Sequence, residues 1–161
     1  MPSQTDKLWF SEQVRPMLDT LYHVAYAVVQ NDADAQDAVQ DCIEQAYVSL
    51  DSLKDRKKFQ PWIMRILKNK CYALLRQKKH VIPFDDLPES GIEPFDDMDL
   101  KAAFSRLSAE SRLAITLYYY EGYRVSEIAA LLNEPEGTVK SRLSRARKAL
   151  RQDLQEVPYA N

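Results

Sequence analysis

Glycine and cysteine are scarce in this chain of 161 residues, which contains three glycines and two cysteines. Sheets built from many short strands need glycine at their tight turns, so the scarcity argues against an all-β fold. Cys42 and Cys71 lack metal-ligand spacing and are expected to be buried free thiols. No apolar run is long enough to cross a bilayer, and no secretory signal peptide is recognisable, so a cytoplasmic protein is expected.

Catalytic and metal-binding patterns are also missing. Neither His23 nor His80 has a partnering nucleophile in the sequence. No glycine-rich phosphate loop and no cluster of metal ligands occurs. The sequence therefore predicts no enzyme activity, no cofactor and no metal.

The charges lie in alternating blocks that the net charge of −2 conceals. From Asp19 to Ser52 there are acids but no lysine or arginine, whereas residues 54–80 are rich in both and hold a single acid, Asp55. Residues 81–99 are acidic without any base, and the C-terminal region is basic again. Blocks of opposite sign indicate several partners of different charge.

Apolar residues recur at helical spacing in three long N-terminal segments. The first spans about residues 8–30, with its apolar stripe at Val14, Leu18, Leu21, Val24, Ala25 and Val28. The second begins with Asp32 or Asp34 as its cap and runs to Leu50, with Ala35, Val39, Ile43, Ala46 and Leu50 inward. The third has Pro61 in its first turn and runs to about Lys79, with candidate core residues Trp62, Ile66, Leu67, Cys71, Leu74 and Leu75.

Residues 81–97 combine three prolines with acids, a composition typical of a linker. Two further helices are expected at about 100–107 and 109–120, the second capped by Ser108 and ended by Gly122. The predicted fold class is all-α, with two small helical domains joined by a flexible acidic linker. The predicted boundaries are 1–80 for the first domain, 81–98 for the linker and 99–161 for the second domain.

The segment 125–150 has the pattern of a helix-turn-helix. Asn133 suits the left-handed backbone of a tight interhelical turn, and Pro135 suits the first turn of the next helix. In that second helix the residues expected to face inward at helical spacing are Val139, Leu143, Ala146 and Leu150. Its basic and hydroxyl side chains then project outward, as on a helix that enters a major groove. Arg142 and Arg145 have the geometry to donate two hydrogen bonds each to a guanine edge.

Several motifs resemble the sigma-70 family of bacterial transcription initiation factors, and specifically its extracytoplasmic-function (ECF) group. Residues 112–122, 127–129 and 137–146 resemble sigma region 4, the last stretch reading Gly-Thr-Val-Lys-Ser-Arg-Leu-Ser-Arg-Ala. Residues 34–40 resemble the part of region 2 that docks on RNA polymerase. Residues 59–62, followed by Arg65, Asn69 and Arg76, resemble its promoter-melting segment. The chain departs from the family pattern at Gln36, at Cys42-Ile43, and at Asn133-Glu134, where glycine and an apolar residue are usual.

The resemblance implies a sigma factor whose partners are promoter DNA and core RNA polymerase. On the polymerase, the first domain is expected to bind the clamp helices of the largest subunit, and the second domain is expected to bind the flap region. An anti-sigma factor is a further expected partner. Contacts to the −35 element are expected from Thr138, Lys140, Ser141, Arg142, Ser144, Arg145 and Lys148. Capture of the −10 element is expected from Lys57, Lys58, Phe59, Arg65, Lys68, Asn69 and Arg76. Polymerase binding is expected from Asp34, Asp37, Gln40, Asp41 and Glu44.

Some alternatives stay open at this level. Trp62 lies on the apolar stripe and is expected in the core rather than under a flipped base, whereas Phe59 fits either place. Asn69 is a base or backbone contact, or simply an exposed polar residue. For the whole chain, the alternatives are a stand-alone helix-turn-helix regulator that uses only the C-terminal module, and a helical adaptor that binds protein alone.

Overall fold

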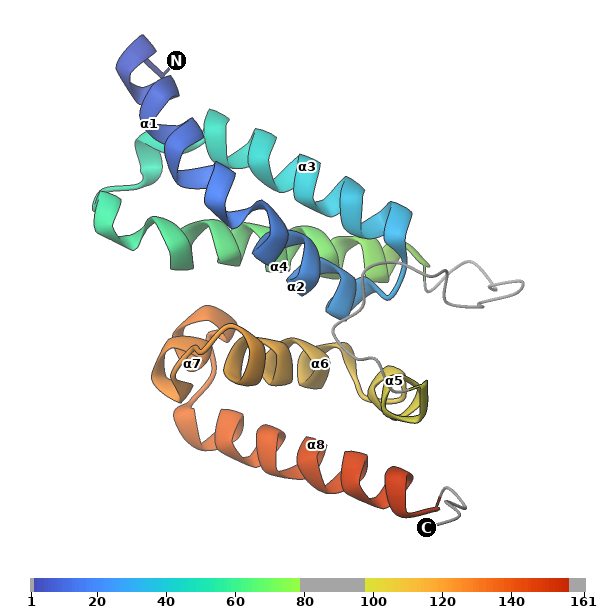
Figure 1. The fold of residues 1–161 in the computed structure, drawn as a ribbon. Coiled ribbons are helices and arrows are strands. Elements are labelled where there is room, and N and C mark those ends of the chain that lie inside the picture. The colour runs from blue at the N-terminus through green and yellow to red at the C-terminus, as the bar shows by residue number, and fades with distance from the viewer. Residues whose placement is uncertain (1, 79–97, 157–161) are drawn as a thin grey trace. The chain divides into compact units, whose positions relative to one another are not determined.

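The computed structural model describes residues 2–78 and 98–156, which form helices and no strands. The helices gather into two compact units, one with α1–α4 and the other with α5–α8 (Figure 1). The predicted all-α class with two helical domains is therefore confirmed. The predicted linker, residues 81–98, lies outside the described residues except for Met98, which begins α5.

The first unit begins with two helices joined end to end. Helix α1 spans Gln4–Val14, a 3-10 turn η1 spans Arg15–Met17, and α2 spans Leu18–Val29. The sequence predicted one continuous helix here. Pro16 has no N–H to donate, so the α-helical ladder is interrupted at this point and the chain tightens into the 3-10 turn.

Two longer helices complete this unit. Helix α3 spans Asp32–Val48, and α4 spans Phe59–Lys78 after two short 3-10 turns, η2 at Leu50–Ser52 and η3 at Arg56–Lys58. The prediction that an aspartate caps α3 is wrong: the side chain of Asn31 accepts the hydrogen bond from the N–H of Asp34, at 2.9 Å. Helices α2, α3 and α4 pack on one another pairwise (Figure 1).

Small side chains let these three helices approach closely. The buried face of α3 consists of Ala35, Ala38, Cys42 and Ala46, each completely enclosed. The prediction placed Val39 and Ile43 inward, but the small-residue stripe takes the core and leaves both half-exposed. The predicted stripe of α2 is buried as expected, with one exception: Leu18 is 42% exposed.

An aromatic cluster joins α1 to α4. The Phe59 ring is 2% exposed and lies 5.3 Å from Trp9, 5.8 Å from Phe10 and 5.9 Å from Trp62 between ring centroids. Arg56 adds a cation–π contact, 4.4 Å above the Trp9 ring, and its guanidinium bonds to the Asp6 carboxylate at 2.5 Å. That hydrogen bond holds the pKa of Asp6 at about 2.

The second unit contains α5 (Met98–Ser105), α6 (Ala109–Ile115), η4 (Thr116–Tyr120), α7 (Val125–Leu132) and α8 (Glu136–Glu156). Ser108 caps α6 as predicted, accepting from the N–H of Ser111 at 3.1 Å. The expected helix 109–120 differs in one respect, because its last five residues form a π-helix. Gly122 follows with a φ of 72°, the left-handed backbone that glycine adopts without a steric penalty.

The predicted helix-turn-helix is present as α7 and α8. Ile128, Leu131, Val139, Leu143 and Ala146 are buried between these helices and the rest of the unit. Asn133 ends α7 with φ 55° and ψ 48°, the left-handed conformation that the sequence predicted. Pro135 immediately precedes α8, and its carbonyl accepts from the N–H groups of Thr138 and Val139 at 3.0 and 3.2 Å.

Candidate DNA and protein interfaces

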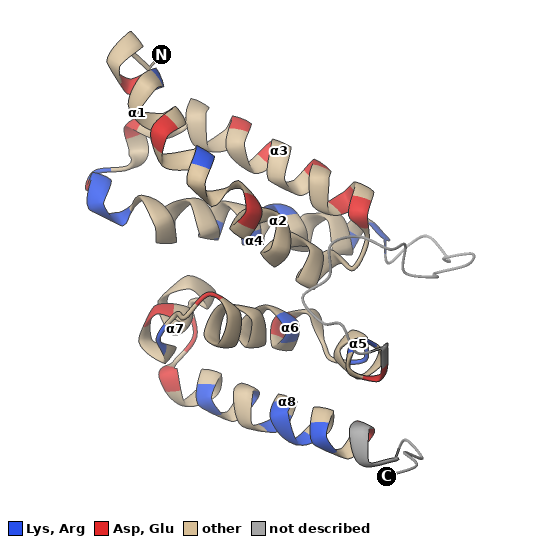
Figure 2. Ribbon diagram, in the orientation of Figure 1, with Lys and Arg blue, Asp and Glu red and all other residues tan. Residues whose placement is uncertain are grey.

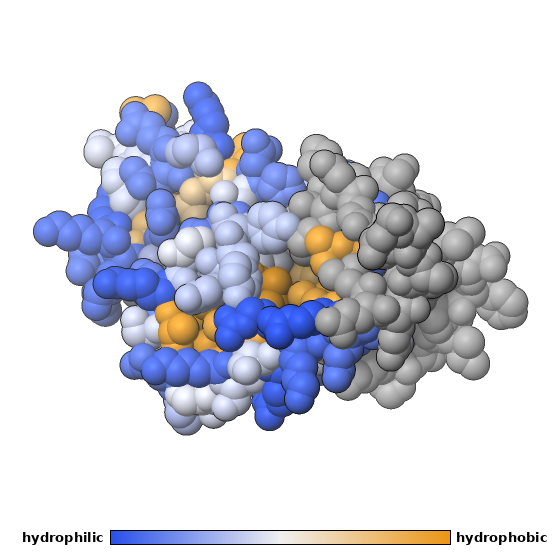
Figure 3. Space-filling view, turned by 60° about the horizontal axis from the view of Figure 1, so that its bottom comes forward, coloured by the Kyte–Doolittle hydropathy of each residue, from blue (hydrophilic) through white to orange (hydrophobic). Residues whose placement is uncertain are grey.

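The outer face of α8 carries most of the side chains that the sequence assigned to duplex DNA. Basic residues follow one another along this helix in Figure 2, and the side of the molecule turned forward in Figure 3 is mostly hydrophilic where it is described. These side chains form a row along α8, the recognition row, which begins with the half-buried Thr138. The exposed members are Lys140, Ser141, Ser144, Arg145 and Lys148.

Arg142 is placed differently from its neighbours. Its side chain is only 18% exposed, and Nη2 donates to both carboxylate oxygens of Glu134 at 2.9 Å. The Nε atom is enclosed and has no hydrogen-bond partner. The sequence grouped Arg142 with Arg145 as a base contact, but in the structure its guanidinium lies against the interhelical turn.

Two further basic residues extend the exposed row of α8, and the sequence analysis did not single them out. Arg147 and Arg151 are exposed and follow Lys140 at seven and eleven residues, which places all three on one side of the helix. Arg147 Nη1 donates to the hydroxyl of Tyr119, on the π-helix, at 2.7 Å. Their spacing of seven and eleven residues from Lys140 in the sequence already indicates that they share its side of the helix.

A second basic surface lies on the first unit. Arg65, Asn69 and Arg76 are exposed at intervals of four and seven residues, so they form a stripe on the side of α4 that faces away from its core. Lys57 and Lys58 are exposed in η3 just before the helix. Lys68 is half-buried, with Nζ 6.0 Å from the centroid of the Tyr72 ring.

Of the two aromatic residues at the start of α4, the sequence left the place of Phe59 open and favoured the core for Trp62. Phe59 is a core residue, so its ring is not available for stacking on a base. Trp62, predicted in the core, is half-exposed instead. It precedes Arg65 by three residues and Asn69 by seven, so it borders the same stripe. The reason is the register of the buried face, which runs through Phe59, Ile63 and Leu67.

An acidic surface covers the outer side of α3. Asp37, Gln40, Asp41 and Glu44 are exposed on one face, and Gln40 Nε2 donates to Glu44 Oε1 at 3.4 Å. Asp34 stands apart from this group, because its half-buried carboxylate forms an ion pair with Lys78 at the end of α4. The charge of Asp34 is therefore neutralised by a residue of the same unit.

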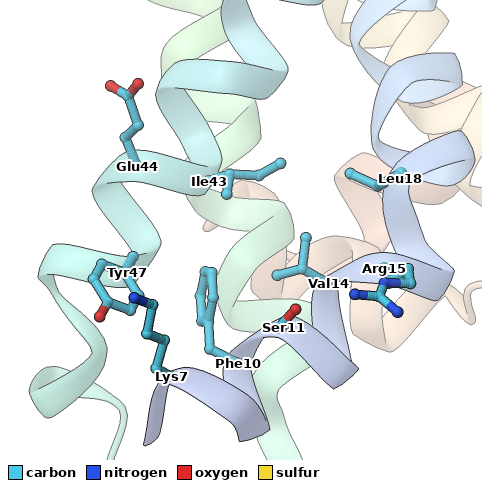
Figure 4. A pocket seen from close by; sticks show the side chains of 9 residues that line it. All are labelled: Lys7, Phe10, Ser11, Val14, Arg15, Leu18, Ile43, Glu44 and Tyr47. Atoms are coloured by element: carbon cyan, nitrogen blue, oxygen red, sulfur yellow. The ribbon is translucent and has the colours of Figure 1, made fainter. Parts of the chain in front are cut away.

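An apolar groove borders the acidic surface, between α1 and α3 (Figure 4). It encloses about 450 Å³ and is lined by Phe10, Val14, Leu18, Ile43 and Tyr47, with Lys7, Ser11, Arg15 and Glu44 around them. Glu44 belongs to both features. This side of the first unit therefore offers carboxylates next to an apolar depression.

Both cysteines of the chain are buried free thiols. Burial raises the pKa of Cys42 and of Cys71 to about 12, so both thiols stay protonated at neutral pH. Within the ranges 2–78 and 98–156, no group of three or more histidine, cysteine or acidic side chains is arranged to hold a metal ion.

These features define a class of protein: a two-unit helical nucleic-acid-binding factor with a helix-turn-helix in one unit, and with a basic stripe and an acidic surface in the other. Comparison with known proteins narrows the class. The sequence model of "Sigma-70 region 2" matches residues 13–81, and that of "Sigma-70, region 4" matches residues 97–150.

Individual relatives agree with these matches over nearly the whole chain. The RNA polymerase sigma factor SigV of Bacillus subtilis is 30% identical over 94% of this chain and 94% of its own length. The ECF RNA polymerase sigma factor SigW of the same organism is 28% identical, with 92% and 90% covered. The RNA polymerase sigma-E factor of Streptomyces coelicolor is 31% identical, with 91% and 86% covered.

Solved structures give the same answer for the fold. The sigma factor RpoE of Bartonella quintana, crystallised with the anti-sigma factor NepR, superposes with a TM-score of 0.77 at 28% identity, covering 92% of this chain and 98% of that one. CnrH, solved with the cytosolic domain of CnrY, shows the same fold, with a TM-score of 0.69 at 24% identity over 92% and 89% of the two chains.

The chain belongs to the sigma-70 family, in its extracytoplasmic-function group. It is a sigma factor, a DNA-binding initiation factor for promoter recognition by RNA polymerase. In the part of the chain that the structure describes, no helix is both long enough and apolar enough to traverse a membrane.

Proposed function

We propose that each unit recognises one promoter element and that the acidic side of the first unit holds the factor on core RNA polymerase. The observation that carries this proposal is the separation of charge: basic rows on α8 and on η3–α4, and carboxylates on α3. We divide the chain functionally into residues 1–80 for core binding and −10 capture, 81–98 as a tether, and 99–161 for −35 recognition.

In the second unit, α8 enters the major groove of the −35 duplex. Arg145 is the exposed arginine in the middle of the row, and its planar guanidinium matches the two acceptors of a guanine edge. Such a bidentate contact contributes about 1–3 kcal/mol of discrimination between bases. Lys140, Lys148 and the hydroxyl groups of the row position the helix through phosphates.

In the first unit, the stripe of α4 captures the non-template strand of the −10 element. Arg65 and Arg76, with Lys57 and Lys58 upstream, neutralise phosphates, and Asn69 lies between the arginines within reach of a base or of the backbone. Trp62 supplies the ring on which an unstacked base is held, the role for which Phe59 was an open candidate. Loss of binding with added salt follows from this mode of recognition.

On α3, the exposed carboxylates Asp37, Asp41 and Glu44 bind the clamp helices of the largest polymerase subunit, and the neighbouring apolar groove receives a side chain from the same partner. The second unit contacts the flap region. We also propose regulation by an anti-sigma factor, because the Bartonella quintana relative was crystallised with one. The factor itself catalyses no reaction, and it acts in the cytoplasm, where promoter DNA is found.

The alternative is a stand-alone regulator that binds duplex DNA through α7 and α8 without polymerase. Reconstitution distinguishes the two. Core RNA polymerase with this chain should select a set of genomic fragments that share two spaced elements, and should transcribe from them. Fragments that share only one element, selected equally well without polymerase, would favour the stand-alone regulator.

A further inference from the structure

The turn between α7 and α8 has the hydrogen bonds of a Schellman motif. Asn133 is the left-handed residue, the N–H of Glu134 donates to the carbonyl of Ala129 at 3.0 Å, and the N–H of Asn133 donates to that of Ala130 at 3.4 Å. In this motif the residue after the left-handed one commonly makes a hydrophobic contact with the last turn of the helix. Here that position is occupied by Glu134, which departs from the family pattern.

The carboxylate of Glu134 is instead hydrogen-bonded by a residue of α8. Both of its oxygens accept from Nη2 of Arg142 at 2.9 Å, and the side chains of the pair are 25% and 18% exposed. A charge-assisted hydrogen bond with this little exposure is screened less than a surface ion pair. Removing one partner leaves the other charge partly desolvated and unpaired, which is costly.

The pair joins the interhelical turn to the second turn of the recognition helix, α8. Arg142 lies eight residues beyond Glu134 and is flanked in sequence by Ser141 and by the buried Leu143. Fixing its guanidinium against the turn therefore constrains how far α8 is rotated about its own axis, and so which side chains point outward. Lys140, Ser141, Ser144 and Arg145 are the exposed residues whose direction is set in this way.

We propose that Glu134 and Arg142 form a structural brace that orients the DNA-recognition row of α8, and that Arg142 is a positioning residue rather than a base contact. This inference rests on the proposal that α8 recognises the −35 duplex. It replaces the simplest expectation from the sequence, in which Arg142 and Arg145 contact bases as equals.

The brace and a base contact make opposite predictions for a paired apolar replacement. Arg142→Met removes the guanidinium and leaves Glu134 partly buried without a partner, so binding of the selected −35 element falls in either case. Adding Glu134→Ile removes the orphaned carboxylate and restores an apolar residue to its usual place in the motif. If Arg142 is a brace, the double variant recovers binding, whereas a lost base contact cannot be recovered in this way.

The measurement uses full-length chain with core RNA polymerase and compares affinity for a selected promoter with affinity for the same promoter carrying a scrambled −35 element. We expect Arg142→Met to lose about tenfold of this discrimination, and the double variant to return to within about threefold of the wild type. A double variant as weak as Arg142→Met, or an Arg142→Met variant that discriminates like the wild type, overturns the inference.

Arg145→Met is the matched control, because it removes an exposed arginine from the same helix. We expect it to lose discrimination and to gain nothing from Glu134→Ile. If neither Arg142→Met nor Arg145→Met changes the discrimination between the two promoters, the proposal that α8 recognises the −35 element is itself wrong, and so is the inference that rests on it. If Arg145 matters and the double variant does not recover, only the brace is wrong.

A charge exchange separates orientation from folding. In the variant with Glu134→Arg and Arg142→Glu, the ion pair can re-form with its charges reversed. We expect it to melt closer to the wild type than either single exchange, and to discriminate better than either. A folded exchange variant that shows no discrimination would place the Arg142 guanidinium on DNA and overturn the inference.

Discussion

Replacing Phe59 with leucine tests whether this ring belongs to the core or to the DNA-binding surface. The ring is 2% exposed and contacts Trp9 and Phe10 of α1 and Trp62 of α4. Each aromatic pair contributes about 0.5–1.5 kcal/mol beyond the area it buries. Phe59→Ala would also open a cavity, at a cost of about 3–5 kcal/mol. That is a large fraction of the free energy of unfolding of an ordinary domain, so leucine is the better replacement.

Phe59→Leu keeps most of the buried volume and part of the apolar contact with the three rings, so the expected loss is about 1–2 kcal/mol, less than the sum for three complete aromatic pairs. In a unit of this size that corresponds to a melting temperature lower by about 5–10 °C. The assay is thermal unfolding of the intact chain followed by tryptophan fluorescence. Both tryptophans, Trp9 and Trp62, lie in the first unit, so the signal reports that unit alone.

Trp62→Leu is the matched comparison from the same helix. It should weaken binding of single-stranded −10 DNA by the holoenzyme by about 1–3 kcal/mol, the range for one stacked base, while unfolding changes less than in Phe59→Leu. Well below its melting temperature, Phe59→Leu should bind the strand as the wild type does. The opposite pattern, an unchanged melting temperature with lost strand binding in Phe59→Leu, would refute the assignment of Phe59 to the core.

Three further predictions follow from other parts of the structure. Burial raises the pKa of Cys42 and Cys71 to about 12. Both thiols of the folded chain should therefore react with a disulfide reagent at pH 8 at least about 100-fold more slowly than the same thiols in the unfolded chain. Equal reaction rates in the folded and unfolded chains would contradict their burial. Replacing Asp37 and Asp41 together with asparagine should weaken core polymerase binding about two- to fivefold at low salt and less at high salt, as measured by fluorescence anisotropy; a salt-independent loss would argue against a charge contact. Asn133→Ala should lower the free energy of unfolding of the second unit by about 1 kcal/mol, measured by hydrogen exchange of the amides of α7 and α8. Asn133→Gly should leave that free energy within about 0.5 kcal/mol of the wild-type value. Equal effects of the two substitutions would argue against the left-handed turn.

Much of the fold follows from helical periodicity and from a few capping residues. The order of the main helices, the cap at Ser108 and the left-handed turn at Asn133 all depend on local chemistry, and the structure confirms them. Their number was one too low, because the first predicted helix is divided at Pro16 into α1 and α2. The family also follows from the sequence, because its motifs lie in short continuous stretches whose side chains are specific. Boundaries were less accurate where two local signals compete, as at Asn31, which caps α3 in place of Asp32 or Asp34.

What the sequence could not supply is the choice among apolar residues for the core. Trp62 and Ile66 fit a helical stripe as well as Phe59 and Ile63 do, and only the packing of α4 against its neighbours decides between them. The pairing of Arg142 with Glu134 was hidden for a similar reason. A charged residue eight positions away is not a neighbour on a continuous helix, and it becomes one only when the chain reverses at the turn.

The most direct test of the whole account is chemical probing of unpaired thymines in a selected promoter bound by core RNA polymerase and this chain. The account predicts opening of the −10 region on the intact promoter, and loss of opening when either element is scrambled or when half a helical turn, about 5 base pairs, is inserted between them. Opening that survives a scrambled −35 element, or that occurs equally well without this chain, would contradict the claim that its two units recognise two promoter elements together.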